Sequence, residues 1–516
     1  MTTLRGMLAA FALLFLSACV GLPPQADRTE SHAITDTGST RLGEAFAPQT
    51  AQHPELTAFH LLPDAVDALL ARIVLADAAD RTLDLQYYIW HDDLTGRYLG
   101  DAVLRAADRG VKVRVLLDDL GTNGDDRVLL AISSHPNIEI RLFNPVASRT
   151  FKKLGSALEF KRINRRMHNK ALIADNQAAI LGGRNIGDEY FGASSDVAFG
   201  DLDVLTVGPV VHRVSTAFDE FWNSDAAYPI ENLVGHAAPP EALPAYREKL
   251  AAFIASKQNT PYIAQANERL NETLHAPTAY FSWGKATLLY DDPSKITRSP
   301  SDTQGHLLTQ FKALSIQPEK EVLIVSPYFV PGKDGVAWMH SLTQRGVKVT
   351  VLTNSLAATD VAAVHAGYQR YRKALLDAGV TLYELKPAAD EDADTKKSIL
   401  GSSKASLHAK TYVFDRSSIF IGSMNLDPRS ITLNTEVGVY CESAGAATQV
   451  VDGLEPKLDQ IAWRVEEHPD ANGKTRLVWI DTRADGTTTE LDEPGVSTMQ
   501  RVGIWFLGLL PIESQL

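Results

Sequence analysis

The chain has 516 residues, of which 45% are hydrophobic and 22% charged, the composition of a globular protein with enough apolar side chains for more than one core. Its formal net charge of −13 argues against a general affinity for nucleic acid or for an anionic bilayer. The two cysteines, Cys19 and Cys441, exclude a disulfide framework, and no clustered Cys/His spacing predicts a zinc site. We expect Cys441, inside an apolar run, to be an inert buried thiol.

The first residues have the pattern of an export signal. Arg5 precedes an apolar run at 7–16 that is too short to span a bilayer but suits the core of a secretory signal. Leu16-Ser17-Ala18-Cys19 follows directly and resembles the bacterial lipobox, in which cleavage leaves a lipidated cysteine at the new N-terminus. We therefore predict that 1–18 is a signal peptide and that Cys19 is a lipid anchor. The alternative is an ordinary cleaved signal with an incidental cysteine.

A polar stretch at 19–50 follows and is predicted to be a lipoprotein tether. Acyl chains on Cys19 would hold the protein on a membrane without a spanning helix. The expected location is therefore the periplasmic side of a membrane in a bacterial cell envelope. The sequence leaves open whether this is the inner or the outer membrane.

The body of the chain is a tandem repeat. Arg-Gly-Val-Lys-Val at 109–113 recurs at 345–349. Each copy joins a helical pattern to a β-branched apolar strand, and another predicted strand lies upstream. The elements are strand 83–89, helix 98–108 and strand 111–117 in the first half, and strand 322–328, helix 336–344 and strand 347–352 in the second.

This alternation predicts an α/β fold of two tandem domains, 51–235 and 301–470, each with helices on both faces of a sheet. Residues 236–300 are predicted to be a linker plus a segment packed against one half. The C-terminal extension, 471–516, contains the apolar run 502–511, which either lies in a membrane interface or packs onto the body.

A His-x-Lys-x₄-Asp motif occurs once in each half. The copies span 168–175 and 408–415, and after the same gap each is followed by Gly-x-x-Asn, at 182–185 and 422–425. A single copy is more typical of an exposed strand, but two copies in corresponding places of a duplicated fold indicate a site.

The residue types of the motif suit a phosphate group. Because residues i and i+2 share a strand face, we expect His168 to project beside Lys170 and His408 beside Lys410. The ammonium would neutralise non-bridging oxygens, while the imidazole attacks phosphorus or protonates a leaving oxygen. The remaining motif residues are the amides Asn185 and Asn425, which can donate to the same oxygens, and the strand-end residues Asp175 and Asp415, expected to form structural ion pairs.

The doubled motif resembles the phospholipase D superfamily, in which two motifs meet across a pseudo-two-fold axis to form one site. The resemblance covers most of the chain after residue 55 and implies two α/β/α sandwiches with mixed sheets. It also implies that one histidine becomes a covalent phosphohistidine while the other protonates the leaving alcohol and then deprotonates the acceptor. We assign His168 as nucleophile and His408 as acid/base, although the near-symmetry permits the reverse. The resemblance implies no metal and no other cofactor.

The superfamily also places an acidic residue behind each histidine to fix its tautomer. Glu436 matches this position for His408. For His168 the counterpart is Asp201 or Asp203, and the sequence cannot choose because the two share a strand face. The first motif has Gly183 where the second has Ser423, which removes one possible hydroxyl donor.

Several segments are similar to those of bacterial cardiolipin synthases: 87–90, 118–119, 143–145, 162–168 and 364–368. Together with the lipobox, the stretch 290–295 makes the resemblance strongest to the C type. A basic cluster also approaches His168, formed by Lys152, Lys153, Lys161, Arg162, Arg165 and Arg166. It is either a solvated loop or a site that recruits an anionic headgroup such as phosphatidylglycerol. We expect the aromatic run 87–90 to be mostly core, with at most one ring near the site.

The implied reaction is a ping-pong exchange that makes cardiolipin. A donor, phosphatidylethanolamine or phosphatidylglycerol, gives its phosphatidyl group to His168, and the terminal hydroxyl of phosphatidylglycerol resolves the intermediate. Water in that role would make the chain a phospholipase D. A secreted nuclease would share the motifs, but the acidity and the anchor count against it. The expected partners are membrane phospholipids and the membrane surface, with no nucleic acid and no second subunit, because one chain carries both half-sites.

Overall fold

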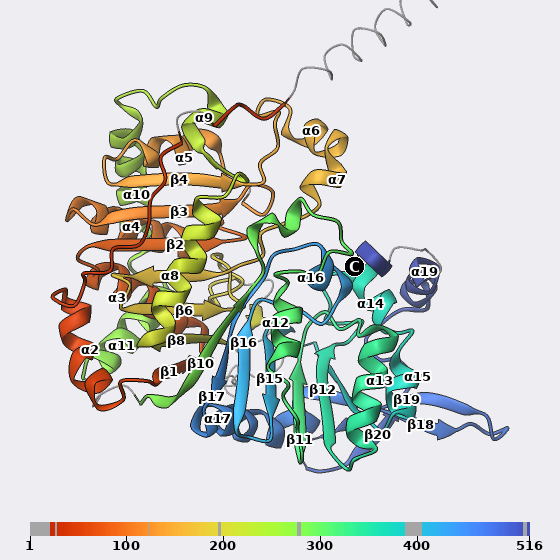
Figure 1. Ribbon diagram of the computed structural model, residues 1–516. Helices are drawn as coiled ribbons and strands as arrows, with labels where there is room; N and C mark the ends of the chain where they lie inside the picture. Colours follow the sequence, from red (N-terminus) through yellow and green to blue (C-terminus); the bar gives the residue numbers. More distant parts are fainter. Residues whose placement is uncertain are drawn as a thin grey trace, which may run out of the picture.

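The computed structural model describes residues 21–25, 28–122, 124–194, 198–275, 280–387, 405–483, 485–508 and 513–515. The predicted signal peptide and Cys19 lie outside these residues. The described chain forms two halves side by side, each a layer of strands with helices packed against it (Figure 1).

In the first half the strands lie in the order β9-β4-β3-β2-β5-β6-β8-β1. Strands β2, β3 and β4 are parallel to one another, and the other neighbours in this sheet are antiparallel. The bounds are β1 Thr57–Leu62, β2 Thr82–Tyr87, β3 Lys112–Asp118, β4 Ile138–Phe143, β5 Ala171–Ala174, β6 Ala178–Gly182, β8 Asp203–Val207 and β9 Ala227–Pro229.

The second half repeats this order as β18-β13-β12-β11-β15-β16-β17-β10, with β11, β12 and β13 parallel. Strands β19 and β20 extend its outer edge. The bounds are β10 Ser282–Tyr290, β11 Glu321–Val325, β12 Lys348–Asn354, β13 Thr381–Leu385, β15 Lys410–Phe414, β16 Ser418–Gly422, β17 Val437–Glu442, β18 Ala462–Pro469, β19 Thr475–Thr482 and β20 Thr488–Leu491. The mixed α/β fold and the internal duplication expected from the sequence are confirmed.

The two sheets are joined where β1 pairs antiparallel with β10, from Thr57 opposite Gly284 to Phe59 opposite Ser282. A second link is the parallel pair β7 (Ala198–Gly200) and β14 (Ala405–Leu407). Strand β10 falls in the stretch 236–300, so this stretch supplies a strand that bridges the halves and is more than a linker. Its helices α10 (Ala242–Lys257) and α11 (Pro261–His275) pack on the first half.

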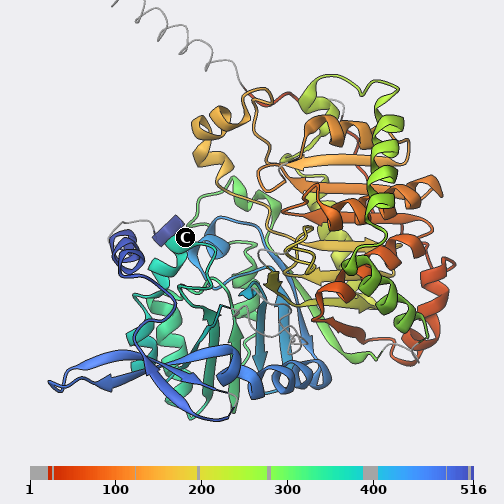
Figure 2. The same cartoon turned by 180° about the vertical axis from the view of Figure 1, so that it is seen from behind.

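The helices cover both faces of the sheets (Figures 1 and 2). Two of them, α8 (Pro209–Trp222) and α17 (Ala444–Leu454), contact the central strand β10 and contribute Val214 and Val450 to an apolar core that both halves share. Two further cores each lie within one half. The shared core fixes how the halves sit against each other, because it would be exposed if they separated.

The remaining helices pack around the sheets and range from four to sixteen residues in length. Local signals explain several ends: the Asp93 side chain accepts a hydrogen bond from Gly96 N and so caps α4. The bounds are α2 Arg41–Gln52, α3 Ala65–Ala78, α4 Leu94–Asp108, α5 Asp126–Ser133, α6 Lys152–Leu158, α7 Phe160–Ile163, α9 Ile230–Val234, α10 Ala242–Lys257, α11 Pro261–His275, α12 Leu307–Ala313, α13 Gly332–Thr343, α14 Ala362–Tyr368, α15 Arg372–Asp377, α16 Pro428–Thr432, α18 Leu458–Ile461 and α19 Thr498–Gly508.

The C-terminal extension packs onto the second half. Strand β19 pairs with β18, and α19 lies against α14. The apolar run 502–511 was expected either to lie in a membrane interface or to pack onto the body. Its described part favours packing on the body, and residues 509–512 lie outside the described chain. Among the residues described, no helix is long and apolar enough to cross a membrane.

Candidate active site

The two motifs occupy equivalent places at the centre of the molecule, just ahead of β5 and β15. Lys410 is the first residue of β15, and His168, Lys170 and His408 precede their strands. The expectation that each histidine sits on the strand with its lysine is therefore wrong. The reason is that the backbone here turns to the other half: His168 N donates to Thr435 O at 2.9 Å, and His408 N donates to Gly200 O at 2.8 Å.

Each histidine is hydrogen-bonded to a buried carboxylate from the opposite half. His168 Nδ1 lies 2.8 Å from Glu436 Oε2, and His408 Nδ1 lies 2.6 Å from Asp201 Oδ2. The expected pairing of Glu436 with His408 and of Asp201 with His168 is thus reversed. The backbone hydrogen bonds between the halves bring Glu436, just before β17, to His168. In the same way they bring Asp201, just before β8, to His408.

The choice between Asp201 and Asp203 is also resolved. Asp203 lies at hydrogen-bond distance from Arg72 (2.8 Å) and within ion-pair distance of Arg184 (3.3 Å), and all three side chains are buried. Asp203 therefore neutralises buried arginines, while Asp201 contacts a motif histidine.

This arrangement fixes the tautomer of both rings. A carboxylate at Nδ1 holds a proton on that nitrogen, so the neutral ring carries its lone pair on Nε2, the nitrogen that can attack phosphorus or take up a second proton. Both histidines are almost buried, with 8% and 6% of their surfaces exposed. A nitrogen with a free lone pair in a site that excludes most water is suited to attack phosphorus.

The electrostatics of the two pairs differ. Burial, together with Lys170 and Lys410, lowers the pKa of His168 well below its ordinary value, and burial raises the pKa of its partner Glu436 to about 7. Burial also lowers the pKa of His408. Although burial opposes its ionisation, His408 and Lys410 bring the pKa of Asp201 down to about 2. The Asp201 carboxyl group beside His408 is thus fully ionised at neutral pH, whereas the Glu436 carboxyl group beside His168 is only partly ionised.

Both motif lysines are buried and turned toward the histidines. Lys170 Nζ donates to His168 O at 2.6 Å, and Lys410 Nζ donates to His408 O. Burial lowers the pKa of Lys170 well below its ordinary value and that of Lys410 to about 8. Two ammonium groups this close to each other and to both rings form a site for an anion that would offset their desolvation.

The two asparagines are buried, and each comes three residues after the second strand of its motif hairpin. Asn185 Oδ1 accepts a hydrogen bond from Ile89 N at 3.2 Å, which leaves the amide nitrogen as a donor. The Oδ1 atom of Asn425 is buried with no hydrogen-bond partner among the described residues. The role of both amides in binding phosphate oxygens stays a prediction.

Asp175 and Asp415 lie at the far end of their strands from the histidines and hold the hairpin turns. Asp175 accepts hydrogen bonds of 2.7–2.9 Å from three successive backbone N–H groups, at 80–82, and Asp415 accepts equivalent bonds at 319–321. Their φ angles of 51° and 52° lie in the left-handed region that aspartate tolerates. The expected ion pairs are wrong: the partners are backbone amides, which brace each hairpin against the start of the neighbouring strand.

The difference between Gly183 and Ser423 follows from the two acids. A Cβ atom at Gly183 would lie 2.1 Å from Asp201 Oδ1, so this acid leaves no room for a side chain. At the equivalent place the Ser423 hydroxyl donates to Glu436 Oε2. The difference between glycine and serine in the two motifs therefore goes together with the difference between aspartate and glutamate at the acid position.

Aromatic rings line both histidines. Tyr88 lies 5.3 Å from the His168 ring, and Tyr190 and Phe199 lie 5.3 and 5.1 Å from the His408 ring, all measured between ring centroids. One ring of the run 87–90 thus reaches the site, as expected, while Tyr87 is fully buried and bonded to Arg72. Sequence reasoning missed Tyr190 and Phe199, which carry no motif.

The residues that precede each histidine are held from the ends of β3 and β12. Asp118 accepts a hydrogen bond from Met167 N at 3.0 Å, and Asn354 both accepts from and donates to the backbone of Leu407. The sequence offered Asp118 only as part of a family-like segment. Asn354 is the structural equivalent of Asp118 in the second half, and the internal repeat could have revealed it.

The basic cluster is largely occupied by internal contacts. Arg166 pairs with Asp118, Arg162 with Glu159 and Lys152 with Asp119, while Arg165 donates to backbone carbonyls at 295–298. Lys153 and Lys161 are exposed. Any recruitment of an anionic headgroup by this cluster therefore rests on these two lysines.

One group of side chains in the described chain has metal-ligand character: His91, Asp93 and Glu189, whose ligand atoms lie within 4.8 Å of one another. Their atoms already have protein partners, since Asp93 caps α4 and accepts from Asp188 N, and His91 Nδ1 lies 3.3 Å from Glu189. Nothing here assigns them a metal.

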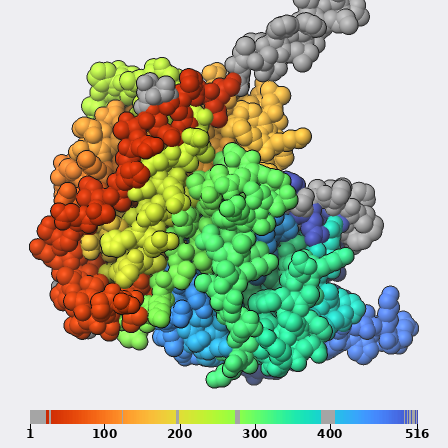
Figure 3. Space-filling model, viewed as in Figure 1, coloured from red at the N-terminus to blue at the C-terminus, as the bar shows by residue number. Residues whose placement is uncertain are grey.

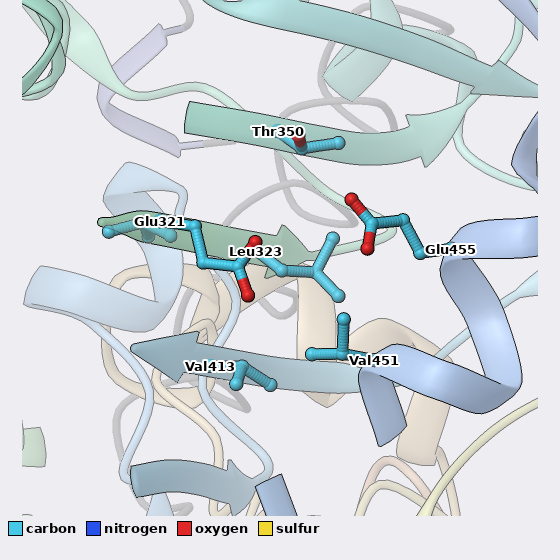
Figure 4. Close-up of a pocket in the computed structure, with 7 residues that line it drawn as sticks. Glu321, Leu323, Thr350, Val413, Val451 and Glu455 are labelled. Atoms are coloured by element: carbon cyan, nitrogen blue, oxygen red, sulfur yellow. The ribbon is translucent and has the colours of Figure 1, made fainter. Parts of the chain in front are cut away.

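Figure 4 shows a small cavity between α17 and strands of the second half, lined by Glu321, Val322, Leu323, Thr350, Val413, Val451 and Glu455. Its volume of about 10 Å³ is room for no more than one water molecule. It contains none of the motif residues and offers no substrate site.

Fold and site together define a two-motif enzyme of the phospholipase D type. Residues 73–222 and 315–457 match the family described as "Cardiolipin synthase, PLD-like domain". The chain is 42% identical over 485 residues to cardiolipin synthase C of Escherichia coli K12, a match that covers 92% of this chain and 99% of the relative. The chain belongs to this family of phospholipase D-like cardiolipin synthases.

Two other similarities extend the comparison. An uncharacterised protein of Helicobacter pylori strain 26695 is 31% identical over 482 residues, covering 92% of both chains. The crystal structure of phosphatidylserine synthase from Haemophilus influenzae has the same fold, with a TM-score of 0.54 at 15% identity over 81% of this chain and 92% of that one.

The different partners of Asp201 and Asp203 predict different defects. Asp201→Asn should lower kcat by about 100-fold or more, because His408 loses the carboxylate that fixes its tautomer, while the protein stays folded. Asp203→Asn should lower the free energy of unfolding by about 3–5 kcal/mol, because it leaves buried arginines unpaired. Urea denaturation and steady-state rates on both variants separate the two effects. A stable Asp203→Asn protein with the larger loss of kcat would contradict the assignment.

Proposed function

We propose that the chain is a phosphatidyltransferase that makes cardiolipin from phosphatidylglycerol and a donor phospholipid through a phosphohistidine. The observation that carries this proposal is the pair of buried histidines, each bonded at Nδ1 to a carboxylate of the opposite half, beside two buried lysines. The substrate follows from the relative in Escherichia coli, a cardiolipin synthase, which matches along 99% of its length. That relative gives no support to the phospholipase D or nuclease alternatives.

In the first half-reaction the donor phosphodiester binds with its non-bridging oxygens on Lys170 and Lys410, and the amides of Asn185 and Asn425 donate to the same oxygens. His168 Nε2 attacks phosphorus and forms a P–N bond. The bond from phosphorus to the headgroup oxygen breaks, and the proton on His408 Nε2 passes to that oxygen. The headgroup alcohol leaves, and the phosphatidyl group stays on His168.

The electrostatic difference between the two pairs supports this division of roles. The strongly lowered pKa of His168 keeps the ring neutral and nucleophilic at neutral pH. The ionised Asp201 stabilises the imidazolium that His408 needs in order to act as an acid. Exchanged roles would place the cationic ring beside Glu436, whose raised pKa of about 7 leaves it only partly ionised.

In the second half-reaction the terminal hydroxyl of phosphatidylglycerol enters the position of the departed headgroup. The neutral His408 accepts its proton, the oxygen attacks phosphorus, and the P–N bond to His168 breaks. The products are cardiolipin and the regenerated enzyme. The donor can be phosphatidylethanolamine or phosphatidylglycerol, because both present the same phosphodiester to the site.

We further propose that Cys19 carries the lipid anchor and that the protein acts as a monomer at the periplasmic side of a membrane. The lipobox-like sequence after an apolar run supports the anchor. The monomer is supported by the presence of both half-sites in one chain, since His168 and His408 take their acids from each other's half.

The central test incubates purified protein with labelled phosphatidylglycerol, with and without phosphatidylethanolamine, and identifies the products in a lipid extract. Wild-type protein should form cardiolipin and release glycerol or ethanolamine. His168→Ala should abolish the product and His408→Ala should nearly do so, because each removes a group that handles phosphorus or its leaving oxygen. His212→Ala is the matched control, since His212 is exposed on α8. Wild-type levels of cardiolipin from the double histidine variant would refute the mechanism.

The pKa of Lys410 predicts the alkaline side of the pH profile. Phosphate binding needs the ammonium form, which is lost as the pH rises through about 8, so kcat/KM should fall above that pH. Lys410→Arg keeps its charge throughout and should move the falling limb to higher pH at a lower maximum rate. Initial rates measured from about pH 6 to about pH 10 test this. An unchanged limb in Lys410→Arg would show that another group controls it.

A further inference from the structure

An exposed apolar patch lies on the segment that leads into the first motif. Phe151, Leu154, Leu158 and Phe160 are 67%, 56%, 67% and 58% exposed. They are four of the eight large apolar side chains that are strongly exposed in the described chain, gathered within ten residues. We call these four residues the α6–α7 patch. A cluster of this kind marks a contact with a partner or a membrane, whereas isolated exposed apolar residues need no explanation.

The segment is held to the body at Gly155 and through Asn144, and these contacts leave the patch exposed. Gly155 is buried, and a Cβ atom there would lie 2.9 Å from a Val146 methyl group, so the helix sits close to the body on this side. Asn144 Nδ2 donates to the carbonyls of Arg162 and Arg165 at 3.1 and 2.8 Å. Phe151, Leu154 and Leu158, spaced three and four residues apart, follow one another along one side of the segment, and all three are exposed.

The charges around the patch suit an anionic surface. Lys153 and Lys161 are exposed beside the apolar side chains. Glu159, the acidic residue of the segment, is engaged by Arg162 and by Ala147 N. On a chain with a net charge of −13, an apolar patch with two exposed lysines differs from the average surface. Apolar side chains flanked by lysines are the pattern of interfacial membrane contacts.

The described chain begins at the end of the molecule that carries the α6–α7 patch. Gln25 donates to Asp225 O and Arg28 to Ser224 O, and the next residue in that loop, Ala226, accepts from Asn144 N. Figures 1, 2 and 3 show the first described residues, in red, at the end of the molecule that carries α6 and α7. Cys19 lies two residues before Gly21, so the chain length keeps their Cα atoms within about 7 Å and an anchor on Cys19 would attach at this end of the chain.

We propose that the α6–α7 patch docks onto an anionic phospholipid bilayer, with its four apolar side chains in the boundary between headgroups and acyl chains. This inference rests on the proposed function and on the anchor at Cys19. The patch and the anchor form two attachments on one side of the molecule. His168 follows the end of α7 by five residues, so the bound surface delivers phospholipid next to the nucleophile.

The test compares two forms of one substrate. The variant has Phe151, Leu154, Leu158 and Phe160 all replaced by Ser in the full chain. Cardiolipin formation is measured on phosphatidylglycerol vesicles and on short-chain phosphatidylglycerol dissolved as monomers. We expect kcat/KM to fall by roughly 10-fold or more on vesicles and to stay within about 2-fold on monomers, because docking matters only at a bilayer. Val74→Ser with Trp338→Ser is the matched control, since both residues are exposed and apolar but lie outside the patch.

Equal rates for wild type and the variant on vesicles would overturn the proposal, as would equal losses on vesicles and monomers. If wild-type protein made no cardiolipin from either substrate, the proposed function would fail instead. Docking would then be judged by flotation of the Cys19→Ser protein with phosphatidylglycerol vesicles. In that assay the four Ser substitutions, or Lys153→Glu with Lys161→Glu, should reduce binding to phosphatidylglycerol vesicles, and unchanged binding in both variants would contradict docking.

Discussion

Two buried hydrogen bonds cross between the halves of the molecule, one from His168 to Glu436 and one from His408 to Asp201. Because each histidine takes its tautomer from a residue of the other half, neither half alone contains a complete acid–base pair. The rest of the fold holds these two bonds in place. The β1–β10 pairing makes the sheets continuous, the β7–β14 pair aligns the loops, and α8 and α17 fill the shared core. The site is thus a property of the interface between two repeats.

The duplication supplies symmetry, and a few substitutions then separate the roles. Gly183 makes room for Asp201, while Ser423 supplies a hydroxyl to Glu436. The consequence is one pair with an ionised carboxylate and one with a carboxyl group whose pKa is raised to about 7. A single step that needs both a neutral nucleophile and a proton donor is favoured when the two pairs differ in this way. Small changes around a symmetric centre thus give identical motifs different electrostatic surroundings.

The sequence predicted the elements of the fold well and the mutual placement of the motif residues poorly. Helix and strand periodicity located β2, β3, β11 and β12 to within a few residues, because that information is local. The partners of the histidines were predicted within each half, and the structure reverses them, because the register between two repeats leaves no local pattern. The same limit explains Asp203, whose role depends on Arg72 more than 100 residues away, and the basic cluster, most of whose charges meet internal partners.

The most direct measurement of the account is the chemical trapping of the intermediate. His408→Ala protein would be mixed with phosphatidylglycerol carrying a labelled phosphate, quenched under conditions that preserve phosphohistidine, digested and mapped by mass spectrometry. The account predicts that the phosphatidyl label sits on His168. The P–N bond forms slowly in this variant, because the acid that protonates the leaving headgroup is missing, and it persists, because the base that activates the acceptor is missing as well. A label on any other residue, or cardiolipin formed with no enzyme-bound label, would contradict it.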